Sequence, residues 1–308
     1  MRIEEPWKVL SLQLSGKAVK VPLWKSGQGR PLLLLHGWGL DHTSLDWLRD
    51  QISADYCCIT LDFPGFGCCD LPISTSSSEA ENGAAPPQGS PGWGVADFVD
   101  LIVQILEALA LPTVSLLGHS FGGRVGLRLA ALQPERVEAL FLIAAAGLRR
   151  PQSLRRRLQV SLLRRLGRCA SWLLPCSLAI PLRERLIRKI ASKDYLEAGP
   201  LRTTLVKVVN EDAAPYVARI QAPTLILWGQ EDQETPLWMA QELHRLIAHS
   251  RLHVLPGFDH HSILCQGHYQ IAYLMRTFQS KVFLSSSHPQ PSLGPCADTS
   301  HPSATVLP

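Results

Sequence analysis

Hydrophobic and polar residues follow two different periods along this chain. Segments 8–14 and 17–24 alternate at every second residue, as in a hairpin at the edge of a sheet. Segments 31–37 and 57–67 are continuous apolar runs that end in Gly, which is typical of strands buried on both faces. Residues 43–52, between them, have the spacing of an amphipathic helix.

The same alternation of strands and helices continues through the rest of the chain. Further strands are predicted at 113–118, 137–147, 223–229 and 251–257. Further helices are predicted at 93–111, 121–134, 236–249 and 263–283. This order predicts an α/β fold in which a mostly parallel central sheet is flanked by helices on both faces.

One long segment interrupts the alternation. Residues 148–215 are helical in character and stand between two sheet strands, so they are predicted to form an inserted helical cap over one end of the sheet. The core then comprises 1–147 and 216–283. Residues 74–92 are rich in Ser, Gly, Pro and Ala and predict a flexible insertion, and the polar, Pro-rich residues 284–308 predict a disordered tail.

The composition is that of a soluble globular protein, with 46% hydrophobic and 18% charged residues. It contains no uninterrupted apolar run of transmembrane length, and the first residues lack the apolar region of a secretory signal. The eight cysteines form no Cys-x-x-Cys pair, so neither a zinc site nor thioredoxin-type redox chemistry is expected. We therefore expect a cytoplasmic protein.

Positive charge is concentrated in the predicted cap. Residues 149–189 hold eleven Arg and one Lys against a single acid, Glu184, and this net +11 within a chain of net +4 leaves −7 on the remainder. Three interpretations stay open: a solvated face, an amphipathic helix on an anionic membrane, and a site for an anionic substrate or partner protein. Nucleic acid is not expected, because nothing else resembles a binding module. The arginines of the membrane interpretation are Arg155, Arg156, Arg157, Arg164 and Arg165.

Residues with catalytic potential follow three of the predicted strands. Ser120, Asp232 and the pair His260 and His261 come directly after apolar runs, and the carboxyl ends of parallel strands meet at one edge of a sheet. A serine hydroxyl needs an adjacent base to become a nucleophile, and histidine has a suitable pKa. A carboxylate behind the histidine fixes its tautomer and stabilises the imidazolium.

The stretch "GHSFGG" fits the G-x-S-x-G elbow, in which a serine occupies a strained turn between a strand and a helix. Glycines on either side avoid clashes with the neighbouring backbone. The N–H of Phe121 then points into the site from the helix N-terminus, and the turn "HGWG" supplies a second N–H from Trp38. Two such donors form an oxyanion hole for a tetrahedral intermediate.

Several stretches together resemble the α/β-hydrolase fold family, in the large group with a helical cap after the sixth strand. They are "LLLHGWG", "LDFPGFG", "LLGHSFGG", "PTLILWGQEDQETP" and "LPGFDHHS", and the resemblance covers roughly residues 20–283. It implies a serine hydrolase without cofactor or metal. The implied nucleophile, acid, base and oxyanion donors are Ser120, Asp232, His260, Trp38 and Phe121.

The resemblance leaves alternatives at two positions. The family pattern Pro-Gly-x-x-His selects His260, while the adjacent His261 stays as the alternative base because neighbouring side chains point in different directions. Asp212 is the alternative to Asp232 as the acid. Structural roles are expected for three further residues: His36, Asp62 and His119. The family often has a serine soon after "GFG", where this chain has two cysteines, so the shape of that rim stays open.

These residues predict a serine hydrolase of the esterase or lipase type, which cleaves a carboxylic ester or similar acyl bond of a largely apolar small-molecule or lipid-like substrate through an acyl-enzyme. Similar chains cleave carbon–carbon bonds or act as cofactor-free haloperoxidases with the same triad. A non-catalytic, membrane-docked binding protein is a further alternative. A serine at the elbow argues against the dehalogenase and epoxide-hydrolase branches, which use Asp there.

If the arginine-rich helix contacts a membrane, replacing Arg155, Arg156 and Arg157 by Gln is expected to weaken binding to anionic vesicles by roughly a hundredfold, because each basic residue contributes about 1 kcal/mol. Co-sedimentation of the full chain with phosphatidylserine-containing liposomes measures this, with phosphatidylcholine liposomes as the control. Binding that does not change in the variant rules out this helix as the contact.

Overall fold

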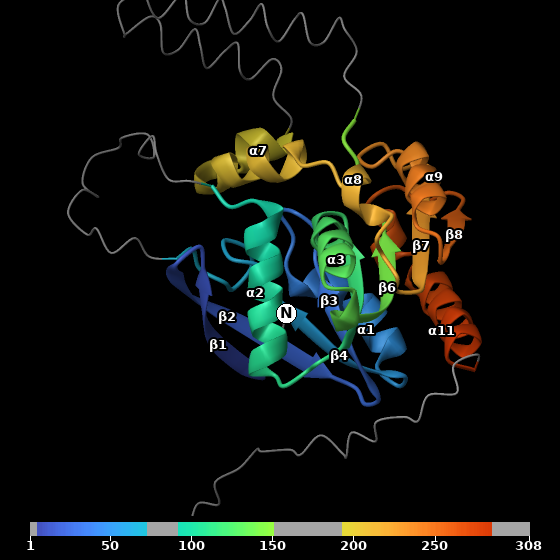
Figure 1. The fold of residues 1–308 in the computed structure, drawn as a ribbon, viewed down its shortest axis with the longest axis horizontal. Coiled ribbons are helices and arrows are strands. Elements are labelled where there is room, and N and C mark those ends of the chain that lie inside the picture. Colours follow the sequence, from blue (N-terminus) through green and yellow to red (C-terminus); the bar gives the residue numbers. More distant parts are fainter. Residues whose placement is uncertain (1–4, 73–91, 151–192, 285–308) are drawn as a thin grey trace, which may run out of the picture.

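The computed structural model describes residues 5–72, 92–150 and 193–284 (Figure 1). Most of the predicted insertion and tail, and the part of the predicted cap that holds the membrane-contact arginines, lie outside the described residues. The predictions for these segments therefore stay predictions.

An eight-stranded sheet forms the centre of the molecule, in the order β1-β2-β4-β3-β5-β6-β7-β8. Its strands are β1 Lys8–Leu14, β2 Lys17–Ser26, β3 Arg30–Leu35, β4 Tyr56–Leu61, β5 Val114–His119, β6 Val137–Ile143, β7 Thr224–Gly229 and β8 Ser250–Leu255. The β1–β2 and β2–β4 pairs are antiparallel and all other pairs are parallel. The predicted edge hairpin and mostly parallel sheet are confirmed.

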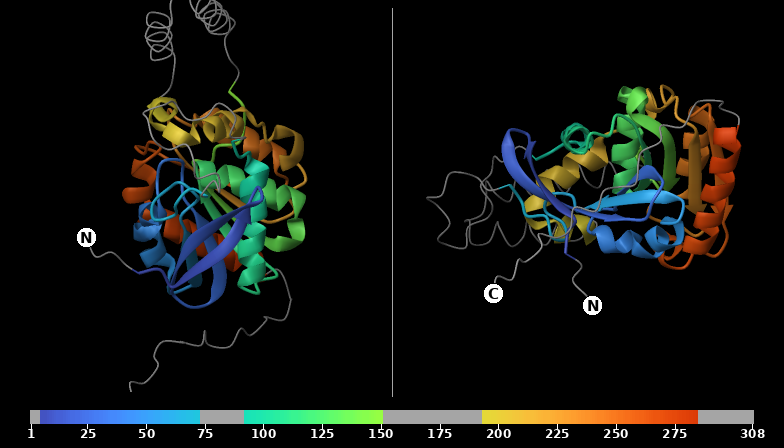
Figure 2. Two further views of the ribbon diagram at one scale, coloured as in Figure 1. Left: turned by 90° about the vertical axis from the view of Figure 1, so that its left-hand side faces the viewer. Right: turned by 90° about the horizontal axis from the view of Figure 1, so that it is seen from below.

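Helices cover both faces of this sheet (Figures 1 and 2). The α-helices are α1 Asp46–Ile52, α2 Val95–Ala108, α3 Phe121–Leu132, α6 Lys193–Glu197, α7 Arg202–Asn210, α8 Ala214–Val217, α9 Leu237–Leu246, α10 Ser262–Cys265 and α11 His268–Leu284. The 3₁₀ helices are η1 His42–Leu45, η2 Pro134–Arg136 and η3 Gly199–Leu201. None of the helices within the described ranges is long and apolar enough to cross a membrane.

Alternation within the central strands produces two hydrophobic cores. In β3, Leu33 and Leu35 pack toward α2 and α3, while Leu32 and Leu34 pack toward α1 and α11. Every residue of β4, β5 and β7 is buried, which explains why these strands are continuous apolar runs in the sequence.

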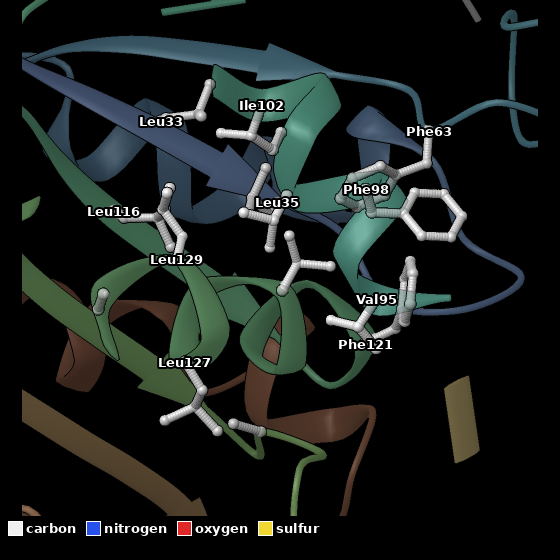
Figure 3. Close-up of a cluster of buried hydrophobic side chains, with 14 of the residues drawn as sticks. Leu33, Leu35, Phe63, Val95, Phe98, Ile102, Leu116, Phe121, Leu127 and Leu129 are labelled. Carbon is white, nitrogen blue, oxygen red and sulfur yellow. The ribbon is translucent and has the colours of Figure 1, made fainter. Parts of the chain in front are cut away.

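In the core between the sheet and helices α2 and α3, three phenylalanines pack together where the sheet meets the starts of these helices (Figure 3). Phe98 is fully buried, and its ring makes edge-to-face contacts with Phe63 and Phe121 at centroid distances of 5.5 and 5.0 Å. Phe121 directly follows Ser120, so this cluster supports the turn that carries the proposed nucleophile.

The two ends of the predicted cap segment lie side by side. The N–H of Ala213 donates to the carbonyl of Gly147 at 3.0 Å, and the N–H of Arg149 donates to Asp212 at 3.3 Å. The described C-terminal part of this segment forms α6, η3, α7 and the start of α8, which continues to Val217. Helix α7 lies over the start of α2 (Figure 1), where Thr204 accepts a hydrogen bond from the N–H of Trp93 at 3.1 Å.

The prediction of a single last helix over 263–283 is wrong, because the chain turns between α10 and α11. The N–H groups of Gln266 and Gly267 both donate to the carbonyl of Ser262, which closes a terminating turn. A Cβ at Gly267 would stand 2.5 Å from the carbonyl oxygen of Ile263, so the turn requires glycine. Two predicted boundaries shift by one residue. Gly92, the last residue of the predicted insertion, lies against α7, and Leu284, the first residue of the predicted tail, is the last residue of α11.

Replacing Phe98 by Ala is expected to lower the free energy of unfolding by about 3–5 kcal/mol, since it leaves a cavity between two other aromatic rings. Urea denaturation measures the loss. Leu132→Ala is the control, because that side chain is 44% exposed and its truncation is expected to cost less than about 0.5 kcal/mol. Equal losses in the two variants would contradict this account of the core.

Candidate active site

Ser120 occupies a tight turn between β5 and α3. Its φ of 48° and ψ of −110° lie in a region that non-glycine residues rarely adopt. A Cβ at Gly118 would stand 2.5 Å from the carbonyl of Gly122, and a Cβ at Gly122 would stand 2.2 Å from the carbonyl oxygen of Leu35. The glycines of the motif therefore allow three backbone segments to meet closely at this serine.

The structure brings Ser120, His260 and Asp232 together. The Oγ of Ser120 is 3.0 Å from Nε2 of His260, and Nδ1 of His260 is 2.7 Å from Oδ2 of Asp232. Both His260 and Asp232 are buried, on the loops that follow β8 and β7. A carboxylate only accepts hydrogen bonds, so Nδ1 carries the imidazole proton and Nε2 accepts from the serine hydroxyl.

Asp232 accepts four hydrogen bonds. Its Oδ1 accepts from the N–H groups of Glu234 and Thr235 at 2.8 and 2.7 Å, and its Oδ2 accepts from the Thr235 hydroxyl at 2.8 Å and from His260. Burial alone would raise the pKa of this carboxyl, but the hydrogen bonds to His260 and Thr235 outweigh it and hold the pKa below its usual value. Asp232 therefore stays ionised beside the imidazole.

The alternative residues lie elsewhere. His261 points outward, with its side chain 61% exposed, and its Nε2 is 3.1 Å from Glu234. Asp212 accepts hydrogen bonds from the N–H groups of Arg149 and Ala214, at the ends of the predicted cap segment. Neither residue joins the Ser120–His260–Asp232 chain of contacts.

Trp38 and Phe121, the predicted oxyanion donors, lie next to each other at the same site, with their rings 5.5 Å apart. Phe121 is the first residue of α3, so its N–H has no carbonyl one turn earlier in the helix. The next amide, that of Gly122, donates to the carbonyl of His36 at 3.1 Å and ties the start of α3 to the end of β3. The roles of Trp38 and Phe121 as donors stay a proposal.

His36 and His119 are buried and neutral. Nδ1 of His36 donates to the Gly37 carbonyl at 2.8 Å, and its Nε2 accepts from the N–H of Phe63 at 3.0 Å. Nε2 of His119 donates to the backbone carbonyl of His260 at 3.1 Å. Burial lowers the pKa of both rings, and that of His119 to about 3. Both residues hold the loops of the site in place.

Asp62 supports the loops that follow β3 and β4. This buried carboxylate accepts from the N–H and Nδ1 of His42 at 2.7 and 2.9 Å and from the N–H of Cys68 at 2.7 Å. On the adjacent rim, Cys69 is buried and its thiol contacts the carbonyl of Lys20 at 3.2 Å. Within the described residues, no group of three or more His, Cys, Asp or Glu side chains is arranged to hold a metal ion.

The sequence interpretation missed two residues that follow Asp232 in the loop "QEDQETP". The hydroxyl of Thr235 is within hydrogen-bonding distance of Asp232, of His260 Nδ1 and of the Ala144 carbonyl. The carboxylate of Glu234 lies 3.6 Å from Nε2 of His260. An Asp carboxylate often accepts hydrogen bonds from the N–H groups two and three residues later, which forms a recognisable turn. In this chain the turn brings the Thr235 hydroxyl back to the Asp232 carboxylate.

Residues 32–266 match the family model described as the alpha/beta hydrolase family, which is most of the chain. This chain belongs to the alpha/beta hydrolase family. A probable serine hydrolase of Drosophila melanogaster is 31% identical to it over 144 residues, which are 47% of this chain and 39% of the fly protein. The matched part of this chain thus spans well under half the length of that relative.

Other relatives of this alpha/beta hydrolase match along most of their length. A 2-hydroxy-6-oxononadienedioate/2-hydroxy-6-oxononatrienedioate hydrolase of Escherichia coli K12 is 24% identical over 273 residues, covering 82% of this chain and 88% of that protein. The solved structure of a thermophilic esterase from Thermogutta terrifontis superposes with a TM-score of 0.63 at 22% identity, and the match covers 91% of this chain and 99% of the esterase. The structural likeness shows a shared fold.

Replacing Thr235 by Val keeps the side-chain shape but removes a donor to Asp232, so the pKa of Asp232 should rise relative to the unsubstituted protein. The free energy of unfolding at pH 7 should fall by about 1.5–3 kcal/mol, the usual contribution of a hydrogen bond to a charged group. A depressed carboxyl pKa stabilises the fold above the unfolded-state value of about 3.9, and this stabilisation is lost as the pH falls through the folded-state pKa.

The difference between wild type and Thr235→Val should therefore shrink between pH 7 and pH 3, as measured by urea unfolding at a series of pH values. Thr235→Ser retains the hydroxyl and is expected to keep most of the wild-type pH dependence. A difference that stays constant over this range would show that the hydroxyl does not act through Asp232.

Proposed function

We propose that this alpha/beta hydrolase is a serine hydrolase that cleaves carboxylic esters or similar acyl bonds of largely apolar substrates through an acyl-enzyme on Ser120. The observation that carries the proposal is the chain of contacts from Ser120 Oγ through His260 to Asp232, at 3.0 and 2.7 Å. This is the arrangement that nucleophilic catalysis by a serine requires.

In the first half-reaction, Ser120 Oγ attacks the carbonyl carbon of the substrate while His260 Nε2 takes the hydroxyl proton. The carbonyl π electrons move to oxygen, which accepts hydrogen bonds from the N–H groups of Trp38 and Phe121. The tetrahedral intermediate collapses, its bond to the leaving oxygen breaks, and His260 returns the proton to that oxygen. Asp232 stabilises the imidazolium during this exchange.

In the second half-reaction, water replaces the alcohol. His260 removes a proton from the water as it attacks the acyl carbon, and then returns this proton to Ser120 Oγ when the acyl–serine bond breaks. The products are a carboxylic acid and the regenerated serine. The reaction uses only groups of this chain and water, so it requires no cofactor.

Aromatic side chains around Ser120 support an apolar substrate. Trp38 contacts both Phe66 and Phe121 edge to face, at centroid distances of 5.0 and 5.5 Å. Trp38 is only partly buried, so this cluster reaches the surface beside the nucleophile. An acyl chain or ring packed against these side chains gains hydrophobic contact on leaving water.

Hydrolysis of a carbon–carbon bond is the second candidate function. The similarity to the Escherichia coli hydrolase extends over 82% of this chain, and its name specifies a substrate that is not a simple ester. Kinetic comparison of p-nitrophenyl esters of increasing chain length with a 2-hydroxy-6-oxo-dienoate of the ring-fission type distinguishes the two functions. Turnover of the esters alone supports the first, and turnover of the dienoate alone overturns it.

Labelling with a fluorophosphonate probe tests the mechanism directly. We expect wild type to be labelled, Ser120→Ala to lose all labelling, and His260→Asn to react slower by about 10⁴-fold or more, because the serine then has no base. His261→Asn is the matched control one residue away and should still be labelled. Absence of labelling in wild type would refute the proposed function, and loss of labelling in His261→Asn alone would reassign the base.

A further inference from the structure

A second carboxylate stands beside the proposed catalytic histidine. The Oε2 atom of Glu234 is 3.6 Å from Nε2 of His260, the same nitrogen that faces Ser120 Oγ at 3.0 Å. Asp232 contacts the other nitrogen of the ring. Glu234 is therefore on the substrate side of the imidazole, whereas Asp232 is behind it.

The loop holds Glu234 in this position. Its N–H donates to Oδ1 of Asp232 at 2.8 Å, and its carbonyl accepts a hydrogen bond from the guanidinium of Arg150. Its second carboxylate oxygen lies 3.1 Å from Nε2 of His261. The side chain remains 56% exposed, so the carboxylate adjoins both the imidazole and solvent.

We propose that Glu234 selects the charge of the leaving group, so that esters of alcohols bearing a cationic ammonium group are favoured over neutral esters and esters of carboxylate-bearing alcohols are disfavoured. The inference rests on the proposed ester hydrolysis. In that reaction His260 Nε2 delivers a proton to the leaving oxygen, which must come within about 3 Å of it. The leaving oxygen then lies within about 7 Å of the Glu234 carboxylate, a distance shorter than the Debye length in physiological salt.

The neighbouring charges do not replace Glu234 in this role. Both oxygens of Asp232 already accept hydrogen bonds from its own loop and from His260, and Asp232 faces away from Ser120. Arg150 directs its guanidinium at the carbonyls of Gln233 and Glu234. The proposed preference also separates this hydrolase from the Escherichia coli relative, whose named substrate is a dicarboxylate.

The test compares esters that share one acyl chain, the chain that reacts fastest as a p-nitrophenyl ester. The alcohols are choline, its neutral isostere 3,3-dimethylbutanol, and 3-hydroxypropanoate. We expect kcat/KM of wild type to be about tenfold higher for the choline ester than for the neutral ester, and lower again for the anionic ester. Titration of the released acid measures all three rates in the same way.

Glu234→Gln should bring the choline-to-neutral ratio close to one, and Glu234→Lys should reverse the order of the choline and anionic esters. Glu231→Gln is the matched control: this acid is exposed on the same loop and its N–H is bound to the Phe258 carbonyl, so its loss should leave the wild-type ratio. Because the arginine-rich segment is the same in every variant, a change in the ratio reports Glu234 alone.

The outcomes separate this inference from the proposed function. A choline-to-neutral ratio that is equal in wild type and Glu234→Gln overturns the charge selection while ester hydrolysis stands. A wild-type protein that hydrolyses no ester and is not labelled by the fluorophosphonate probe overturns the proposed function and the inference with it. A ratio that falls only in the Glu234 variants supports both.

Discussion

The close approach of three backbone segments at Ser120 is the constraint on which the rest of the site depends. Any side chain at Gly118 or Gly122 would overlap a carbonyl of α3 or β3. With no side chains there, the carbonyl of Ile143 accepts from the Ser120 N–H at 3.1 Å, and the N–H of Ala146 donates back to the Ser120 carbonyl at 2.9 Å. Strands β3, β5 and β6 are thereby fixed to one turn, and an unfavourable backbone conformation that costs about 1–3 kcal/mol is maintained by its surroundings.

Helix α3 begins at this turn and, farther along its length, also binds the chain at Glu211. Arg124 and Arg128, one turn apart, both contact Glu211: the first donates to its carbonyl and the second to its carboxylate, each at 2.7 Å. The hydroxyl of Tyr216 donates to the same carboxylate at 3.0 Å. The chain therefore returns from the predicted cap segment at a position set by the helix that begins beside the nucleophile, and one rigid element positions both.

Much of this architecture follows from patterns in the sequence, because the strands are buried on both faces and the alternation of strand and helix allows few topologies. The elbow was also predictable, because the close backbone contacts around Ser120 leave room only for glycine at 118 and 122, and this spacing of glycines is visible in the sequence. The choice between His260 and His261 depended on family resemblance, because the two adjacent residues are both histidines and differ only in the direction in which their side chains point. The break at Gly267 and the position of Glu234 were not predictable, as both arise from how loops close on each other and not from periodicity.

Two buried imidazoles, those of His119 and His260, are in contact at this site, and only His260 exchanges protons in the proposed reaction. The ring of His119 lies 4.9 Å from that of His260, and its pKa of about 3 keeps it neutral. Its Nδ1 has no hydrogen-bond partner among the described residues, which suits a nitrogen that carries no proton. Because His119 stays neutral, its hydrogen bond to the backbone carbonyl of His260 is the same in weak acid as in weak base. One histidine of the site thus transfers the proton in the proposed reaction, and a second histidine holds the backbone of the first in place.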